Sequence, residues 1–163
     1  MNSNEHIERK NSPRAGLIPY FITKDGTIEY MFMMPSNPKF GGPFLQISKG
    51  MIDDDEDTLT TAIREAEEEL GFKESNGFDY EHLVKDVVTT RAEVYFMDVY
   101  FCKVKKQFDF IRPHYETKYT TWVTNEQFQR EGRRGHLKYV DEIEDILRER
   151  IRNGELECWV DKE

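Results

Sequence analysis

The sequence is short of cysteine, of long apolar runs and of positive charge, and each shortage excludes a class of protein. Only two of its 163 residues are cysteines, Cys102 and Cys158, and they form no CxxC pair. A small secreted domain held together by disulfides needs more of them, so that class is excluded. We therefore expect free thiols and a cytoplasmic location.

Long apolar runs are absent as well. No stretch approaches the roughly 18 residues that a membrane-spanning helix needs, and the polar residues 1–13 lack the apolar centre of a signal peptide. We expect no membrane contact, a polar leader over residues 1–13 and one folded domain over residues 14–163. A chain of this length supports one hydrophobic core rather than two.

Positive charge is in deficit, with 23 Lys and Arg against 32 Asp and Glu and a formal net charge of −9. This balance argues against a general nucleic-acid binder, which places many basic side chains against phosphates. Phosphate chemistry remains open to an acidic protein if divalent cations lie between the two sets of negative charge. The question is then whether the acidic residues are arranged to hold such ions.

Apolar periodicity and turn residues predict an alternation of strands and helices. An Asp25-Gly26 turn between two apolar runs predicts a β-hairpin, and Pro19 within the first run favours an edge strand or a bulge. The expected order is β-β-β-α-β-β-β-α, which indicates a single mixed α/β domain with helices packed on a sheet. The expected strands are 15–23, 27–34, 44–48, 83–90, 94–104 and 118–123, and the expected helices are 58–70 and 140–151.

Nine acidic residues gather in the segment GMIDDDEDTLTTAIREAEEELGF, residues 50–72. Within it, Asp57 is a suitable N-cap for the helix 58–70, and Gly71 is a suitable stop. At about 100° per residue, three carboxylates share one sector of this helix, apart from its apolar face: Glu65, Glu68 and Glu69. Their mutual repulsion requires compensation, which hard divalent ions such as Mg²⁺ or Mn²⁺ provide through oxygen ligands. From the helix alone, an ordinary solvated acidic face remains the alternative.

The aspartates that precede the helix do not form an EF-hand calcium loop. That loop needs glycine at its sixth position and glutamate at its twelfth. Counting from Asp53, these positions hold Thr58 and Arg64, and a count from Asp55 fails in the same way. A calcium loop is therefore excluded.

The same segment resembles the Nudix box, Gx5Ex7REUxEExGU, in which U is a bulky apolar residue. Ala66 is a small residue at the first U position. The other eight defined positions match at fixed spacing: Gly50, Glu56, Arg64, Glu65, Glu68, Glu69, Gly71 and Phe72. The resemblance to the Nudix hydrolases implies an α/β/α sandwich around a mixed sheet. It also implies hydrolysis of a nucleoside diphosphate linked to another moiety, by attack of water on phosphorus.

The resemblance further implies a metal site. Glu65 and Glu69 are the expected principal ligands of Mg²⁺ or Mn²⁺, Glu68 shares that role, and the Gly50 carbonyl is a further ligand. Such ions screen the charge of a pyrophosphate and acidify a bound water molecule.

The remaining box residues are expected to support this site. By resemblance, Arg64 holds the glutamates in orientation and Glu56 acts structurally. The general base is either a box glutamate, Glu68 or Glu69, or a carboxylate from a later loop. Glu116, in HYETKYTTW, is the candidate from a later loop, and an exposed carboxylate without a catalytic role is its alternative.

Residues outside the box are candidates for substrate contact. Arg14, at the start of the first strand, and Lys49, immediately before the box, are the expected phosphate contacts. The basic segment REGRRGH, residues 130–136, indicates a solvated loop rather than a polyphosphate site. Three aromatic residues are candidate stacking partners for a base: Phe40, Phe44 and Tyr95.

The box favours an enzyme over a binding module. The expected substrates are dinucleoside polyphosphates, ADP-ribose and related dinucleotides, with RNA 5′ ends less favoured. The competing hypothesis is a Nudix-fold module that senses a nucleotide without hydrolysing it. All four box glutamates are present in this chain, which favours hydrolysis.

Overall fold

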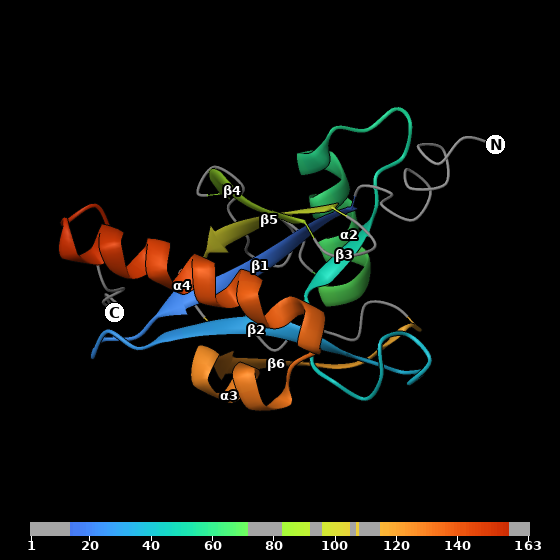
Figure 1. The fold of residues 1–163 in the computed structure, drawn as a ribbon, viewed down its shortest axis with the longest axis horizontal. Coiled ribbons are helices and arrows are strands. Elements are labelled where there is room, and N and C mark those ends of the chain that lie inside the picture. Colours follow the sequence, from blue (N-terminus) through green and yellow to red (C-terminus); the bar gives the residue numbers. More distant parts are fainter. Residues whose placement is uncertain (1–13, 72–82, 92–95, 105–106, 108–114, 157–163) are drawn as a thin grey trace.

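The structure is a computed structural model that describes residues 14–71, 83–91, 96–104, 107 and 115–156. Figure 1 shows strands through the middle of the molecule, with α4 lying across them. The elements, in chain order, are β1 (Arg14–Ile22), β2 (Ile28–Pro35), β3 (Ser48–Met51), α2 (Thr58–Leu70), β4 (Leu83–Arg91), β5 (Phe96–Lys103), β6 (Thr117–Thr124), α3 (Asn125–Glu131), the 3₁₀ helix η3 (Arg134–His136) and α4 (Leu137–Arg152).

A mixed six-stranded sheet forms the middle layer. Five strands follow the order β4-β5-β1-β2-β6, and β3 pairs with β1 outside this path. β1 runs parallel to β5, whereas its pairs with β2 and β3 are antiparallel. β1 is therefore the central strand, with β5 along one edge and β3 followed by β2 along the other.

Helices cover both faces of the sheet. On one face, α2 buries Ala62, Ala66 and Leu70 against apolar residues of β1, β2 and β5. On the other face, α3 and α4 pack on the sheet, and the ring of Phe128 in α3 stacks on Phe32 of β2 with centroids 3.9 Å apart. This α/β/α sandwich confirms the expected fold class.

Several predicted elements are confirmed. The helix 58–70 is found with the same bounds, and the hairpin turns at Gly26, whose φ of 86° is a conformation that glycine adopts readily. Residues 94 and 95, which the prediction includes in a strand, lie outside the described residues. Among the described helices, none is long and apolar enough to cross a membrane.

Pro19 lies inside the central strand, so the prediction of an edge strand is wrong. The edge of β1 that faces away from β5 is divided, because β3 pairs with residues 14–17 and β2 with residues 20–22. The Tyr20 carbonyl accepts a hydrogen bond from Val104 N–H at 2.9 Å on the β5 side. Consecutive residues direct their backbone groups to opposite edges of a strand. The missing N–H of Pro19 therefore faces the interval between the two ladders, where no strand needs it.

The expected strand 44–48 is also wrong, because the strand in this region is β3, which begins at Ser48. The residues before it have separate partners: Gln46 exchanges backbone hydrogen bonds with Met33, while Leu45 bonds to the segment between α3 and η3. A continuous ladder does not form there. Helix α3 is not predicted either, since its seven residues include a single buried apolar side chain, Phe128.

Candidate active site

Helix α2 presents the acidic residues of the box beside β3. Asp57 caps the helix as predicted, since its carboxylate accepts a hydrogen bond from Thr60 N–H at 2.7 Å. Gly71 ends the helix in the left-handed conformation, with φ of 70°. Because the apolar face of α2 rests on the sheet, Glu65 and Glu69 lie on the flank next to β3.

Arg64 holds two box glutamates in place. Its Nε and Nη2 atoms form a two-pronged ion pair with the Glu56 carboxylate at 2.8 and 2.9 Å, and its Nη1 lies 2.9 Å from Glu65 Oε1. The Thr61 hydroxyl donates a further hydrogen bond to Glu56 at 2.9 Å. The hydrogen bond from Arg64 is the main reason that the pKa of Glu56 is lowered to about 2. Glu56 thus stays ionised and fixes the guanidinium that touches Glu65.

Gly50 of β3 lies against the Glu65 side chain. A Cβ atom placed on Gly50 would be 2.1 Å from Glu65 Oε1. Any larger residue would therefore displace the carboxylate or the strand, and only glycine allows this approach. The Gly50 backbone and the Glu65 carboxylate, two of the expected metal ligands, are neighbours for this reason.

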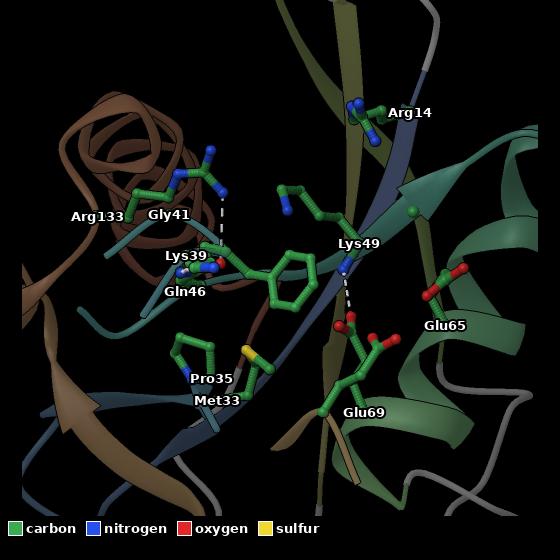
Figure 2. Close-up of a pocket in the computed structure, with 13 residues that line it drawn as sticks. Arg14, Met33, Pro35, Lys39, Gly41, Gln46, Lys49, Glu65, Glu69 and Arg133 are labelled. Carbon is green, nitrogen blue, oxygen red and sulfur yellow. Dashed lines mark hydrogen bonds between the residues drawn. The ribbon is translucent and has the colours of Figure 1, made fainter. Parts of the chain in front are cut away.

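Glu69 faces the backbone at the start of β3. Its Oε1 accepts hydrogen bonds from Lys49 N–H at 2.9 Å and from the Ser48 hydroxyl at 3.1 Å, the first of which is drawn in Figure 2. Burial raises the pKa of Glu69 to about 7, the charge of Lys49 opposes this rise, and that of Glu65 adds to it. The carboxylate is thus held at a defined position in a poorly solvated place.

The carboxylates around Glu65 repel one another. Burial raises the pKa of Glu65, and the charges of Glu68 and Glu116 raise it further, against the attraction of Arg64. Within the part of the chain that is described, no three acidic, histidine or cysteine side chains already enclose a position for a metal ion. The donor set still fits a hard divalent cation, because it offers oxygen atoms whose negative charges oppose one another.

These residues line a cavity of about 450 Å³ that has an acidic and a basic side. Glu65, Glu69 and Glu116 form the acidic side. Figure 2 shows Arg133 across the pocket from the two box glutamates, with the Lys49 side chain between them. Four basic residues line the cavity: Arg14, Lys39, Lys49 and Arg133.

The structure brings most of the sequence-predicted site residues together. Arg64 and Glu68 do not line the cavity; the Glu68 side chain is 46% exposed, and its Oε1 lies 3.8 Å from Arg64 Nη1. The charge of Glu68 nevertheless acts on Glu65, so it lies at the edge of the acidic side. Besides Phe40, six predicted residues line the cavity: Arg14, Lys49, Gly50, Glu65, Glu69 and Glu116.

The prediction of a solvated loop for residues 130–136 holds for the exposed Arg130 and Arg134 but is wrong for Arg133 and His136. Arg133 lines the cavity, and His136 is fully buried, with its Nδ1 accepting a hydrogen bond from Ile47 N–H at 3.1 Å. Gln46 lines the cavity as well and is a further residue that sequence reasoning misses. The basic segment marks Arg133 only as one of several charged residues, and no local signal marks Gln46, because the two residues meet across 87 positions of the chain.

The candidate stacking aromatics are separated by the fold. Phe40 lines the cavity, and its side chain is available to a ligand because the residue is 60% exposed. Phe44 instead lines a second hollow, together with Tyr119. Tyr95 lies outside the described residues.

Solved structures share this fold at low sequence identity. An Ap4A hydrolase of C. elegans in a binary complex has a TM-score of 0.64 at 21% identity, over 83% of this chain and 98% of that one. The Nudix hydrolase RenU from M. smegmatis has a TM-score of 0.58 at 16% identity, over 83% and 86% of the two chains. The NUDIX domain of Shewanella oneidensis NrtR, complexed with ADP ribose, has a TM-score of 0.57 at 11% identity, over 90% and 99%.

The sequence itself matches one family model. A comparison with curated proteins gives no match. The family model of the NUDIX domain matches residues 19–143, which is more than half of the chain and includes the box. With the box in register and the sandwich fold around it, the chain belongs to the Nudix family and is a pyrophosphohydrolase.

Proposed function

We propose that this enzyme hydrolyses the pyrophosphate bond of a nucleotide derivative with the help of Mg²⁺ or Mn²⁺. The observation that carries the proposal is the cavity with partly buried carboxylates on one side and cations on the other. A pyrophosphate is complementary to the basic side directly, and to the acidic side through divalent ions. Glu65, Glu69 and the Gly50 carbonyl are the proposed ligands, with Glu68 joining from the edge of the acidic side.

The residues of the chain have distinct tasks in this reaction. A bound divalent ion screens the phosphates and acidifies water. Arg64 keeps Glu65 in position, and Lys49 and Arg14 bind phosphate oxygens. A carboxylate, either Glu116 or a box glutamate, accepts the proton of the attacking water. Because phosphoryl transfer depends mainly on positioning and charge, these fixed groups supply most of the catalysis.

The proposed substrates are dinucleoside polyphosphates and ADP-ribose, with RNA 5′ ends less favoured. Two fold relatives support this choice by their names alone: one is an Ap4A hydrolase, and another is complexed with ADP ribose. Phe40, exposed at the cavity, is a suitable stacking surface for an adenine base.

A panel assay tests the proposal. The protein is incubated with Mg²⁺ or Mn²⁺ and with diadenosine tetraphosphate, ADP-ribose, NADH or capped RNA, and products are separated by chromatography. We expect turnover of at least one nucleotide and none in EDTA. Hydrolysis that persists in EDTA would contradict the metal requirement. Nucleotide binding without turnover would support the sensing module instead.

A further inference from the structure

Arg133 is a cation on the cavity wall that has no carboxylate partner among the described residues. It lies between α3 and η3, is partly buried, and donates one hydrogen bond from Nη1 to Gln46 Oε1 at 3.4 Å. Four other described arginines, Arg64, Arg130, Arg148 and Arg152, do pair with glutamates. The guanidinium of Arg133 therefore retains donors for another anion.

Gln46 holds the Arg133 guanidinium through a hydrogen bond. The residue is 3% exposed, and both ends of its amide are used: Nε2 donates to the Phe40 carbonyl, and Oε1 accepts from Arg133. Gly41, with φ of 86°, lets the loop pass close by, since a Cβ there would lie 2.6 Å from Gln46 Nε2 and 2.8 Å from Arg133 Cζ. Buried amides that bond at both ends hold a fixed orientation, so Arg133 is held in place rather than loosely solvated.

Lys49 extends toward Arg133 although both are positively charged. Figure 2 shows its ammonium directed away from Glu69 and toward the Arg133 guanidinium, while its backbone N–H stays bonded to Glu69. Two like charges in a poorly solvated place repel each other, and a bound anion removes that cost.

We propose that Arg133, with Lys49 beside it, forms a second phosphate subsite on the basic side of the cavity, apart from the carboxylates that would bind the reacting pyrophosphate through divalent ions. The planar fork of arginine and the compact charge of lysine are both complementary to phosphate oxygens. This inference rests on the proposed function and predicts that, among the proposed substrates, the enzyme prefers nucleotides with three or more phosphates in a chain. ADP-ribose has two phosphates, both required at the bond that is cut, and leaves the subsite empty.

A binding measurement tests the subsite without turnover. Inorganic tripolyphosphate is titrated into metal-free protein by calorimetry, using the wild type, Arg133→Gln and the matched control Arg130→Gln. We expect Arg133→Gln to weaken binding roughly 10-fold or more, the effect of losing a charged hydrogen bond. Arg130→Gln leaves binding unchanged, because Arg130 does not line the cavity. Equal binding by wild type and Arg133→Gln would overturn the subsite.

Kinetics then test the substrate class. For diadenosine tetraphosphate with Mn²⁺, we expect Arg133→Gln to lower kcat/KM roughly 10- to 100-fold, mainly through KM. For ADP-ribose, we expect Arg133→Gln to lower kcat/KM by less than about 3-fold. Arg133→Lys, which keeps the positive charge, is expected to recover part of the kcat/KM for diadenosine tetraphosphate. Equal losses on both substrates in variants with unchanged thermal unfolding would overturn the inference. If the wild type hydrolyses neither, the proposed function fails, while the calorimetry still decides on the subsite.

Discussion

Glu65 and Glu69 lie one helical turn apart on α2, and the chain holds each of them by a different device. Glu65 forms an ion pair with the Arg64 guanidinium and packs against Gly50, which has no side chain. Glu69 instead accepts hydrogen bonds from Lys49 N–H and the Ser48 hydroxyl. Both carboxylates thus have fixed positions before any ion is bound. Fixed positions of charged groups are what phosphoryl chemistry requires.

Gly50→Ala tests the close approach of β3 to Glu65. The new Cβ would lie 2.1 Å from Glu65 Oε1, so the carboxylate moves out of position. We expect kcat/KM to fall roughly 100-fold, as a displacement of about 1 Å can do. Gly135→Ala is the matched control, because a Cβ there meets nothing within 4 Å. Steady-state kinetics of the two variants check this, and equal activities would show that the Gly50 contact is irrelevant.

Because His136 is buried, we expect the free energy of unfolding to depend on pH. Burial lowers its pKa well below 6.5, and the charges of Lys49 and Arg133 add to this. Below about pH 6.5 the unfolded chain binds a proton at this histidine and the folded chain does not. The stability linked to His136 is therefore fully present above pH 6.5 and is lost as the pH falls toward the folded pKa.

The comparison with His136→Asn measures this effect, since the asparagine oxygen accepts a hydrogen bond without titrating. Between pH 7.5 and 5.5, we expect the free energy of unfolding of the wild type to drop by about 1.4 kcal/mol relative to the variant. Glu69 acts with the opposite sign, because its raised pKa favours the folded state as the pH falls. Because Glu69 is present in the wild type and in the variant, its contribution cancels when the two pH profiles are subtracted. Parallel pH profiles from urea denaturation would refute a neutral buried His136.

At the scale of elements, α2 is fixed by its ends. The Asp57 side chain bonds to Thr60 N–H, and Gly71 closes the last turn. Replacing Asp57 with alanine removes the cap, and we expect the free energy of unfolding to fall by about 1 kcal/mol. Asp55→Ala, an exposed neighbour outside the helix, is the control. Chemical denaturation of both variants gives the answer, and equal midpoints would mean that the cap contributes nothing.

Elements with local signals are predictable from the sequence. The cap, the stop and the apolar spacing of α2 all lie within 15 residues, and the Asp25-Gly26 turn lies between its own two strands. The segment before β3 is not predictable in this way. Its residues pair singly with Met33 and with the segment after α3, and such contacts depend on the completed fold.

The residues of the candidate site also divide into those with a local sequence signal and those brought together only by the fold. The box residues are adjacent in the sequence, so their spacing reveals the acidic side of the cavity. Arg133 reaches the cavity only because α3 and η3 return the chain to Gln46, 87 positions earlier. Sequence reasoning therefore found the proposed metal ligands and missed half of the basic side.

At the scale of the whole molecule, an acidic protein encloses a cavity with a basic wall. The formal net charge is −9, yet Arg14, Lys39, Lys49 and Arg133 all line one cavity. The sandwich makes this possible, because α2 supplies Glu65 and Glu69, whereas the basic residues come from β1, β3 and the segments before β3 and after α3. A polyphosphate placed between the two sides meets cations directly and carboxylates through metal ions.

The central claim is that Glu69 acts at the hydrolytic metal site, whereas Glu67, on the same helix, does not line the cavity. The most direct measurement is the Mn²⁺-dependent turnover of diadenosine tetraphosphate by the wild type, Glu69→Gln and Glu67→Gln. The two substitutions remove the same charge from the same helix. We predict a loss of roughly 1,000-fold or more for Glu69→Gln and near wild-type turnover for Glu67→Gln. Full activity of Glu69→Gln, or equal losses in both variants, would contradict the claim.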